Sequence, residues 1–114
     1  MENNPICEID EYGIKRWKLN GELHREDGPA IEFSDGSKYW YKHDKPHRLD
    51  GPAVIQNTKK LLKYNTLSKI IWFINGHNVT DIITNWAKEN DIDLDDLTED
   101  DKLLIKLVWA DYGK

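Results

Sequence analysis

The chain of 114 residues is poor in several residue types, and each scarcity excludes a class of protein. A single cysteine, Cys7, cannot form an internal disulfide, and it has no partner at the spacing typical of a zinc site. No apolar run approaches the roughly 20 residues needed to cross a bilayer, and residues 1–5 lack the basic and apolar segments of an export signal. We therefore expect a cytoplasmic protein without membrane, metal or cofactor.

Methionine and phenylalanine are also scarce, with one and two copies, so bulky apolar material comes mainly from other side chains. Five tryptophans and five tyrosines supply it. The hydrophobic content of 39% suits one domain that buries roughly two thirds of its unfolded surface. We expect a single domain over residues 1–114.

A seven-residue phrase that occurs twice identifies the chain as a repeat protein. The phrase reads His24-Arg25-Glu26-Asp27-Gly28-Pro29-Ala30 in its first copy and His47-Arg48-Leu49-Asp50-Gly51-Pro52-Ala53 in its second. The offset is 23 residues, and the same offset links Trp17 to Trp40. The repeating unit is therefore larger than the phrase itself.

Each unit is predicted to contain about three short antiparallel strands. In the first unit, Asn20-Gly21 separates two short stretches with aromatic and aliphatic residues, which is typical of a tight hairpin with positive φ at both central residues. Residues 27–30 predict a second reversal, because glycine permits unusual dihedrals and proline cannot donate to a ladder. Residues 35–37 predict a third reversal before the second unit begins.

The second and third units depart from the first. In the second unit, Lys45 is expected to replace the turn glycine, which predicts a different turn type. The third unit keeps Asn75-Gly76 but has lost the repeated phrase. Trp40 and Trp72 are 32 residues apart instead of 23, which predicts an inserted, lengthened hairpin at residues 59–65.

After residue 79 the apolar period changes from two to about 3.6 and predicts two helices over residues 80–114. The first helix is expected to have Thr80 or Asp81 as its N-cap and to end within residues 90–96. The second is expected to begin at Thr98, with acidic residues in its first turn. The predicted core-facing residues are Ile82, Ile83, Trp86 and Ala87 in the first helix and Leu103, Leu104, Leu107, Val108 and Ala110 in the second.

The repeated phrase resembles a repeat found in proteins of large tailed phages, giant viruses and some bacteria. In that family an aromatic pair precedes x-Asn-Gly-x-x-His-Arg-x-Asp-Gly-Pro-Ala, and Asp-Gly-Ser follows; residues 12–56 match over two copies and residues 70–79 match in part. The resemblance implies a curled antiparallel sheet of stacked hairpins, similar to membrane-occupation-type hairpin repeats. We expect an α+β fold with about two and a half repeats in residues 1–79 and a helical cap in residues 80–114.

The residues of the repeated phrase allow two interpretations. His24, Arg25 and Asp27 are of the types that serve as base, phosphate clamp and orienting carboxylate in a nuclease or phosphoryl-transfer enzyme. Repetition favours a structural role instead, because a catalytic site needs one converging set whereas structural bonds recur in every unit. We expect the two arginines to pair with Asp27, Asp50 or backbone carbonyls across adjacent hairpins, and the two histidines to bond the turn beside them. The predicted structural set is His24, Arg25, Asp27, Gly28, His47, Arg48, Asp50 and Gly51.

The segment from residue 81 to residue 101 is strongly acidic. Nine acidic residues against one lysine give it a charge of −8, whereas the whole chain has −5. Asp91-x-Asp93-x-Asp95 is similar to the start of a calcium loop, but Asp96 stands where glycine is needed and Lys102 where glutamate is needed. Two interpretations remain: a solvated loop, or an acidic surface that mimics phosphate spacing and docks on a basic groove of a nucleic-acid-handling protein.

Direct nucleic-acid binding is not expected. Basic and aromatic residues are interleaved in the first 74 residues, but strand alternation explains this pattern, and the sequence pI is about 5.3. The resemblance implies a non-enzymatic phage accessory protein that inhibits or redirects a host protein, such as a defence effector, in the host cytoplasm. The predicted interface residues are Trp40, Tyr41, Trp72, Asp91, Asp93, Asp95, Asp96, Glu99 and Asp100. The enzyme and a homo-oligomer remain alternative hypotheses.

Overall fold

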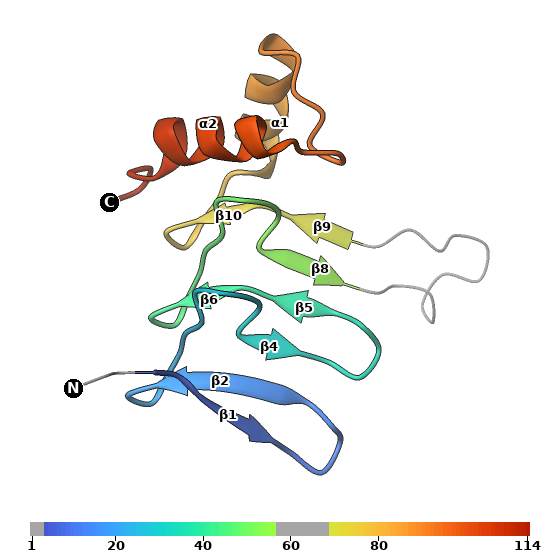
Figure 1. Ribbon diagram of the computed structural model, residues 1–114, viewed down its shortest axis with the longest axis vertical. Coiled ribbons are helices and arrows are strands. Elements are labelled where there is room, and N and C mark those ends of the chain that lie inside the picture. Colours follow the sequence, from blue (N-terminus) through green and yellow to red (C-terminus); the bar gives the residue numbers. More distant parts are fainter. Residues whose placement is uncertain (1–3, 57–68) are drawn as a thin grey trace.

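The computed structural model describes residues 4–56 and 69–114, in which antiparallel hairpins are followed by two helices (Figure 1). The strands are β1 (Ile6–Ile9), β2 (Lys15–Leu19), β3 (Glu22–Leu23), β4 (Ile31–Glu32), β5 (Lys38–Tyr39), β6 (Tyr41–Lys42), β7 (Lys45–Pro46), β8 (Val54–Gln56), β9 (Lys69–Ile71), β10 (Phe73–Ile74) and β11 (His77–Asn78). The helices are α1 (Thr80–Glu89) and α2 (Glu99–Trp109). The predicted α+β architecture is confirmed. The expected curl of the sheet is not a feature that the structure shows.

Successive units stack along one antiparallel sheet, whose strand order is β1-β2-β4-β5-β8-β9. Arg16 opposes Ile31 in the first unit and Tyr39 opposes Val54 in the second, so the register repeats at the 23-residue offset. The small hairpin sheets β6-β7 and β10-β11 stand beside this main sheet (Figure 1). Glu8 of β1 also opposes Arg16, just as Ile31 opposes Tyr39, and each residue of the second pair lies 23 positions after its equivalent in the first. β1 therefore occupies the place of a last strand from a preceding unit.

The turn of the second unit is the same as in the other two, so the prediction of a different turn was wrong. Asp44, and not Lys45, occupies the position of Gly21. Aspartate is among the few non-glycine residues that tolerate positive φ. The central φ values are 54° and 83° in Asn20-Gly21, 49° and 64° in His43-Asp44, and 51° and 84° in Asn75-Gly76.

The break in the period lies between β8 and β9. These two strands pair antiparallel, with Val54 opposite Ile71. Their pairing keeps the third unit in the stack although the offset is longer. The predicted hairpin at residues 59–65 lies outside the described residues.

The two helices begin differently. Val79 is the N-cap of α1 and makes no side-chain cap, so the prediction of Thr80 or Asp81 was wrong. The Thr80 hydroxyl instead accepts a hydrogen bond from the backbone N–H of Trp72 (3.0 Å). The last residue of α1 is Glu89 and its C-cap is Asn90, at the start of the region 90–96 that was predicted to end it. Thr98 caps α2 as predicted: its hydroxyl accepts from the Asp101 N–H and the Asp101 carboxylate accepts from the Thr98 N–H.

The main core lies between the third unit and the helices. It consists of Trp72, Ile74, Val79, Ile83, Ile105 and Trp109. In the first two units, by contrast, the fully buried positions are small, as at Ala30 and Ala53. Neither helix of the described segments is long and apolar enough to cross a membrane. The third unit and its helical cap therefore contain most of the large buried side chains.

The predicted core-facing residues were partly wrong. In α1, Ile83 and Ala87 are buried but Ile82 is 45% exposed. In α2 the buried residues are Ile105 and Trp109, and the predicted leucines and Val108 are on the surface. α2 is apolar on two sides, and the edge-on contact of Trp109 with Trp86 (5.8 Å between centroids) determines which side packs.

Candidate functional site

The arginine of each repeated phrase lies against a tryptophan ring and a glycine. The Cζ atom of Arg25 is 3.8 Å from the centroid of Trp17, and that of Arg48 is 3.9 Å from Trp40. A Cβ atom on Gly51 would lie 2.6 Å from the Arg48 Cζ atom. The guanidinium therefore fills the space that a side chain at this position would need.

The same arginines bind a carboxylate and a carbonyl within their own phrase. Arg48 Nε donates to Asp50 Oδ1 (2.7 Å) and Arg48 Nη1 donates to the Pro52 carbonyl (3.0 Å). Arg25 makes equivalent bonds to Asp27 and to the Pro29 carbonyl, at 2.9 Å and 3.1 Å. The predicted types of partner are thus present in both units, but the bonds lie within one phrase and not across adjacent hairpins as expected.

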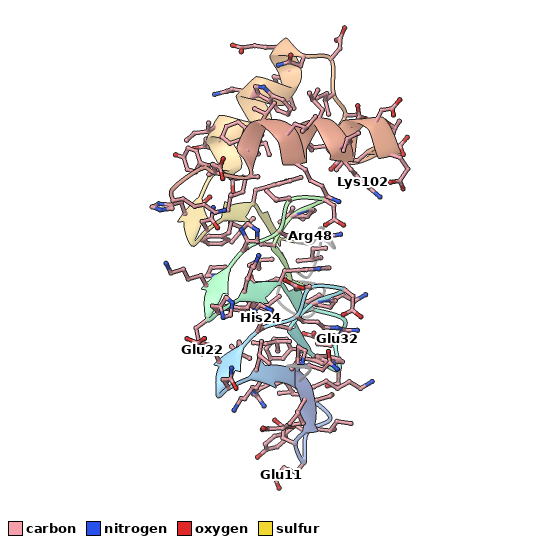
Figure 2. The ribbon with its side chains drawn as sticks, turned by 60° about the vertical axis from the view of Figure 1, so that its left-hand side comes forward. Glu11, Glu22, His24, Glu32, Arg48 and Lys102 are labelled. Atoms are coloured by element: carbon pink, nitrogen blue, oxygen red, sulfur yellow. The ribbon has the colours of Figure 1, made fainter. Side chains whose placement is uncertain are left out.

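The histidines of the repeated phrase join each unit to the next. His24 Nδ1 accepts from the His43 N–H (3.1 Å), and His47 Nδ1 accepts from the Asn75 N–H (2.9 Å). Both rings must therefore be neutral with the proton on Nε2. Burial lowers the pKa of both histidines, which favours this neutral form. Figure 2 shows that His24 lies further from the helices than Arg48 does.

The arrangement leaves the catalytic set poorly formed. His24 is 5% exposed, and its Nδ1 atom is already bonded to the backbone. Asp27 binds Arg25 rather than the histidine that it would have to orient. In residues 4–56 and 69–114, no group of three or more His, Cys, Asp or Glu side chains is placed to hold a metal ion.

A cleft of about 500 Å³ separates the two repeated phrases and reaches α2. It is lined by Arg25, Glu26, Asp27, Gly28, Pro29, Trp40, Lys42, His47, Arg48, Leu49, Asp50 and Lys106. The predicted interface residue Trp40 is therefore at this cleft. Charges of both signs line it, and each arginine is paired with an aspartate of its own phrase. The cleft consequently has no concentration of one charge that would select an ionic ligand.

The other predicted interface residues lie in three different environments. Trp72 is 3% exposed in the core, so it is removed from the candidate surface. Tyr41 is half-buried on β6. The six acidic residues are all exposed: Asp91, Asp93, Asp95, Asp96, Glu99 and Asp100. They line the connection between the helices and the first turn of α2, but not the aromatic part of the sheet.

The most distinctive surface is an apolar stripe on α2, which we call the α2 stripe. Its members and their exposed fractions are Leu103 (57%), Leu104 (39%), Leu107 (76%) and Val108 (51%). Their spacing places them on one side of the helix, opposite Ile105 and Trp109. Sequence reasoning found these residues but assigned them to the core. The available signal was that α2 has more apolar residues than one packed face can bury.

Comparisons of the chain with protein-family models, curated proteins and solved structures gave no match. The chemistry of the exposed side chains is therefore the basis for a functional assignment.

Proposed function

We propose that this chain is a non-enzymatic binding protein that inhibits or redirects a host protein in the host cytoplasm. The observation that carries the proposal is the α2 stripe, in which four large aliphatic side chains are 39–76% exposed on one short helix. Contiguous apolar surface with a polar rim is typical of a protein-interaction site. The resemblance of the repeats to those of phage accessory proteins makes bacterial defence effectors the first class of partner to test.

The roles of the repeated residues support binding rather than catalysis. A general base must have a free nitrogen within reach of its substrate. His24 and His47 use Nδ1 for backbone bonds between units. Both arginines donate to a proline carbonyl of their own phrase, and Arg25 also donates to Glu32. The residues that suggested an enzyme are therefore occupied in stabilising the stack.

The acidic segment at residues 81–101 supports a partner with a basic surface. Residues 81–101, which include the connection between the helices and the first turn of α2, have a charge of −8. Exposed charge of one sign beside an apolar patch speeds encounter with a partner of opposite sign and selects against other partners. A nucleic-acid-handling protein, whose groove is basic, is consistent with this charge.

Capture from bacterial lysate at low and high salt, with mass spectrometry of the bound proteins, tests the proposal. The tagged chain should retain a stoichiometric partner, and the Leu103→Gln/Leu107→Gln double variant should lose it. A matched control is Ile6→Gln/Ile9→Gln on β1, where both isoleucines are also exposed (70% and 63%) but lie at the opposite end of the stack (Figure 1). Loss at high salt would indicate a contribution from screened charges.

The inhibitory part of the proposal has its own readout, the activity of the captured partner with and without this chain. If the stripe variant captures the same protein in the same amount, the α2 stripe is not the binding site and the proposal fails. If the partner is captured but keeps its activity and its other contacts, binding is real and inhibition or redirection is wrong.

A further inference from the structure

We infer that the segment recognised by the α2 stripe is a cationic amphipathic helix, with aliphatic residues on one side and lysine or arginine at its ends. This inference rests on the proposed function, because it identifies the chemistry of a partner that binds the same stripe. Helices of this kind bind apolar helix surfaces through residues at i, i+3, i+4 and i+7.

The charges at the ends of the stripe are the first argument. Asp100 precedes the stripe by one turn and Asp111 follows it, and both are exposed. Asp111 lies two residues beyond the end of α2, but the intervening Ala110 keeps a helical backbone (φ −55°, ψ −35°). Eleven residues are close to three helical turns, so Asp100 and Asp111 lie on the same side as the leucines, roughly 16 Å apart. Lys114 lies 3.4 Å from Asp111, and both of these side chains are largely exposed, so this ion pair is weak.

The basic residues of α2 point elsewhere. Lys106 lines the cleft beside the repeated phrases, on the flank of the helix. Lys102 is 3.6 Å from Glu99 and occupies the same flank, one turn earlier. The exposed side of α2 therefore combines aliphatic side chains with negative charge, and its complement is aliphatic with positive charge.

A second copy of the chain is a poor complement. In an antiparallel pair of α2 helices, Leu104 of one copy can lie opposite Leu107 of the other. The same register then places Asp100 of each copy opposite Asp111 of the other. In a parallel pair of α2 helices, each of these aspartates lies opposite the same residue of the other copy, and the acidic segments at residues 81–101 of the two copies come together. Like charges across an interface oppose association. The stripe is thus better matched to a different chain than to itself.

The test uses two synthetic 18-residue helical peptides with leucine at i, i+3, i+4 and i+7 and alanine at the other central positions, one with lysine and one with glutamate near both ends. Isothermal titration at low salt should show that the lysine peptide binds the full chain and that the glutamate peptide does not. Leu103→Gln/Leu107→Gln should abolish binding of the lysine peptide. Asp100→Asn/Asp111→Asn should weaken it roughly tenfold, with a smaller dependence on salt.

A charge control separates recognition at the stripe from attraction to an acidic protein. Glu8→Gln/Glu11→Gln removes the same net charge at the opposite end of the molecule, where Figure 2 labels Glu11, and should leave the affinity unchanged. If both charge variants weaken binding equally, or if the glutamate peptide binds as well as the lysine peptide, the inference is wrong.

Two further outcomes distinguish this inference from the proposed function. Sedimentation that reveals a wild-type dimer, dissolved by the leucine substitutions, would make a second copy the occupant and overturn the inference. A lysate partner that needs the leucines but is retained at high salt would also overturn it, while leaving the proposed function intact. A partner that ignores the leucines would contradict the proposed function itself.

Discussion

At the scale of single residues, the arginine of the repeated phrase stabilises a unit by contacts that no strand ladder supplies. The Arg48 guanidinium lies over the Trp40 ring, bonds Asp50 and the Pro52 carbonyl, and occupies the space beside Gly51. A planar cation with several fixed donors suits this arrangement, whereas lysine offers neither the plane nor the fork. The packing of this side chain therefore explains why arginine, aspartate and glycine recur together in the phrase.

The contact between Arg48 and Gly51 gives a testable prediction. Gly51→Ala should lower the free energy of unfolding by about 1–3 kcal/mol, because the new methyl group would displace the guanidinium from its partners. Urea denaturation measures this cost. In an Arg48→Met background the same substitution should cost much less, since no guanidinium remains to be displaced. Equal costs in both backgrounds would show that the strain at Gly51 does not come from Arg48.

The two histidines predict that the fold loses stability in mild acid. Burial holds the pKa of His24 and His47 below the usual 6.5, so the unfolded chain binds protons that the folded chain does not. The stability that the two neutral histidines contribute is fully present above pH 6.5 and is lost as the pH falls below that value. Burial raises the pKa of Asp50, but the hydrogen bond and the charge of Arg48, with smaller contributions from a backbone hydrogen bond and Lys106, together hold that pKa below its usual 3.8. The stability that Asp50 contributes is therefore lost only below pH 3.8.

Melting temperatures between about pH 5 and about pH 7.5 test this dependence. The His24→Asn/His47→Asn variant should give a flatter profile, because an amide oxygen can accept the same backbone hydrogen bonds and does not titrate in this range. His77→Asn is the control, since His77 is exposed and its ring contacts Tyr112 rather than a neighbouring unit. A double variant that keeps the full slope would exclude the two histidines as its source.

At the scale of elements, α1 ends the sheet by replacing a missing strand. In the first two units the N–H groups of Trp17 and Trp40 donate to the carbonyls of Ala30 and Ala53. The third unit has no such alanine, and the hydroxyl of Thr80 accepts from Trp72 instead. A side chain in the first turn of a helix thus satisfies a backbone donor that an unpaired sheet edge would leave buried.

Thr80→Val tests this role of the threonine. The change preserves the shape of the side chain but removes the acceptor, so the buried Trp72 N–H should lose its partner and the free energy of unfolding should fall by about 1–3 kcal/mol. Thr84→Val is the matched control, because the Thr84 hydroxyl donates to the Thr80 carbonyl within α1; its cost should be less than about 1 kcal/mol. Similar costs measured by denaturation would contradict the proposed role.

The element scale also shows how far the sequence alone could predict this structure. The repetition predicted the hairpins but not the register of their strands, and Thr98 with its acidic first turn predicted the start of α2. The turn at His43-Asp44 was misread because the repeat was aligned one residue late. The exposed face of α2 was misread because periodicity identifies apolar sides without deciding which one meets the core; the tryptophan contact that decides it is a tertiary effect.

At the scale of the whole molecule, the two ends of the stack are finished differently. The third unit is covered by the helices, and Ile74, Ile83 and Ile105 are completely buried there. β1 lies at the other edge of the sheet, and all four of its residues are exposed. Stability in such stacks is close to a sum over units and their interfaces, so the covered end should hold most of it. The binding surface proposed on α2 is consequently supported by the best-packed part of the protein.

Because the strand register repeats every 23 residues in the first two units, we predict that one complete unit can be deleted from the chain. Deleting residues 15–37 joins Ile14 to Lys38, and β1 then meets β5 in the register it had with β2, because Lys38 and Tyr39 stand 23 residues after Lys15 and Arg16. The shortened chain should unfold cooperatively, with a denaturant m-value lower by roughly a fifth, in proportion to the surface removed. It should also bind the lysine peptide with unchanged affinity, since the α2 stripe is intact.

Deleting residues 15–36 is the control, because a slip of one residue reverses the faces of β5 relative to β1. If both deletions are equally stable, β1 contributes nothing to the stack through its register. If neither folds, the third unit and its helices depend on the first unit, and the stack is a single cooperative whole rather than a sum of repeats.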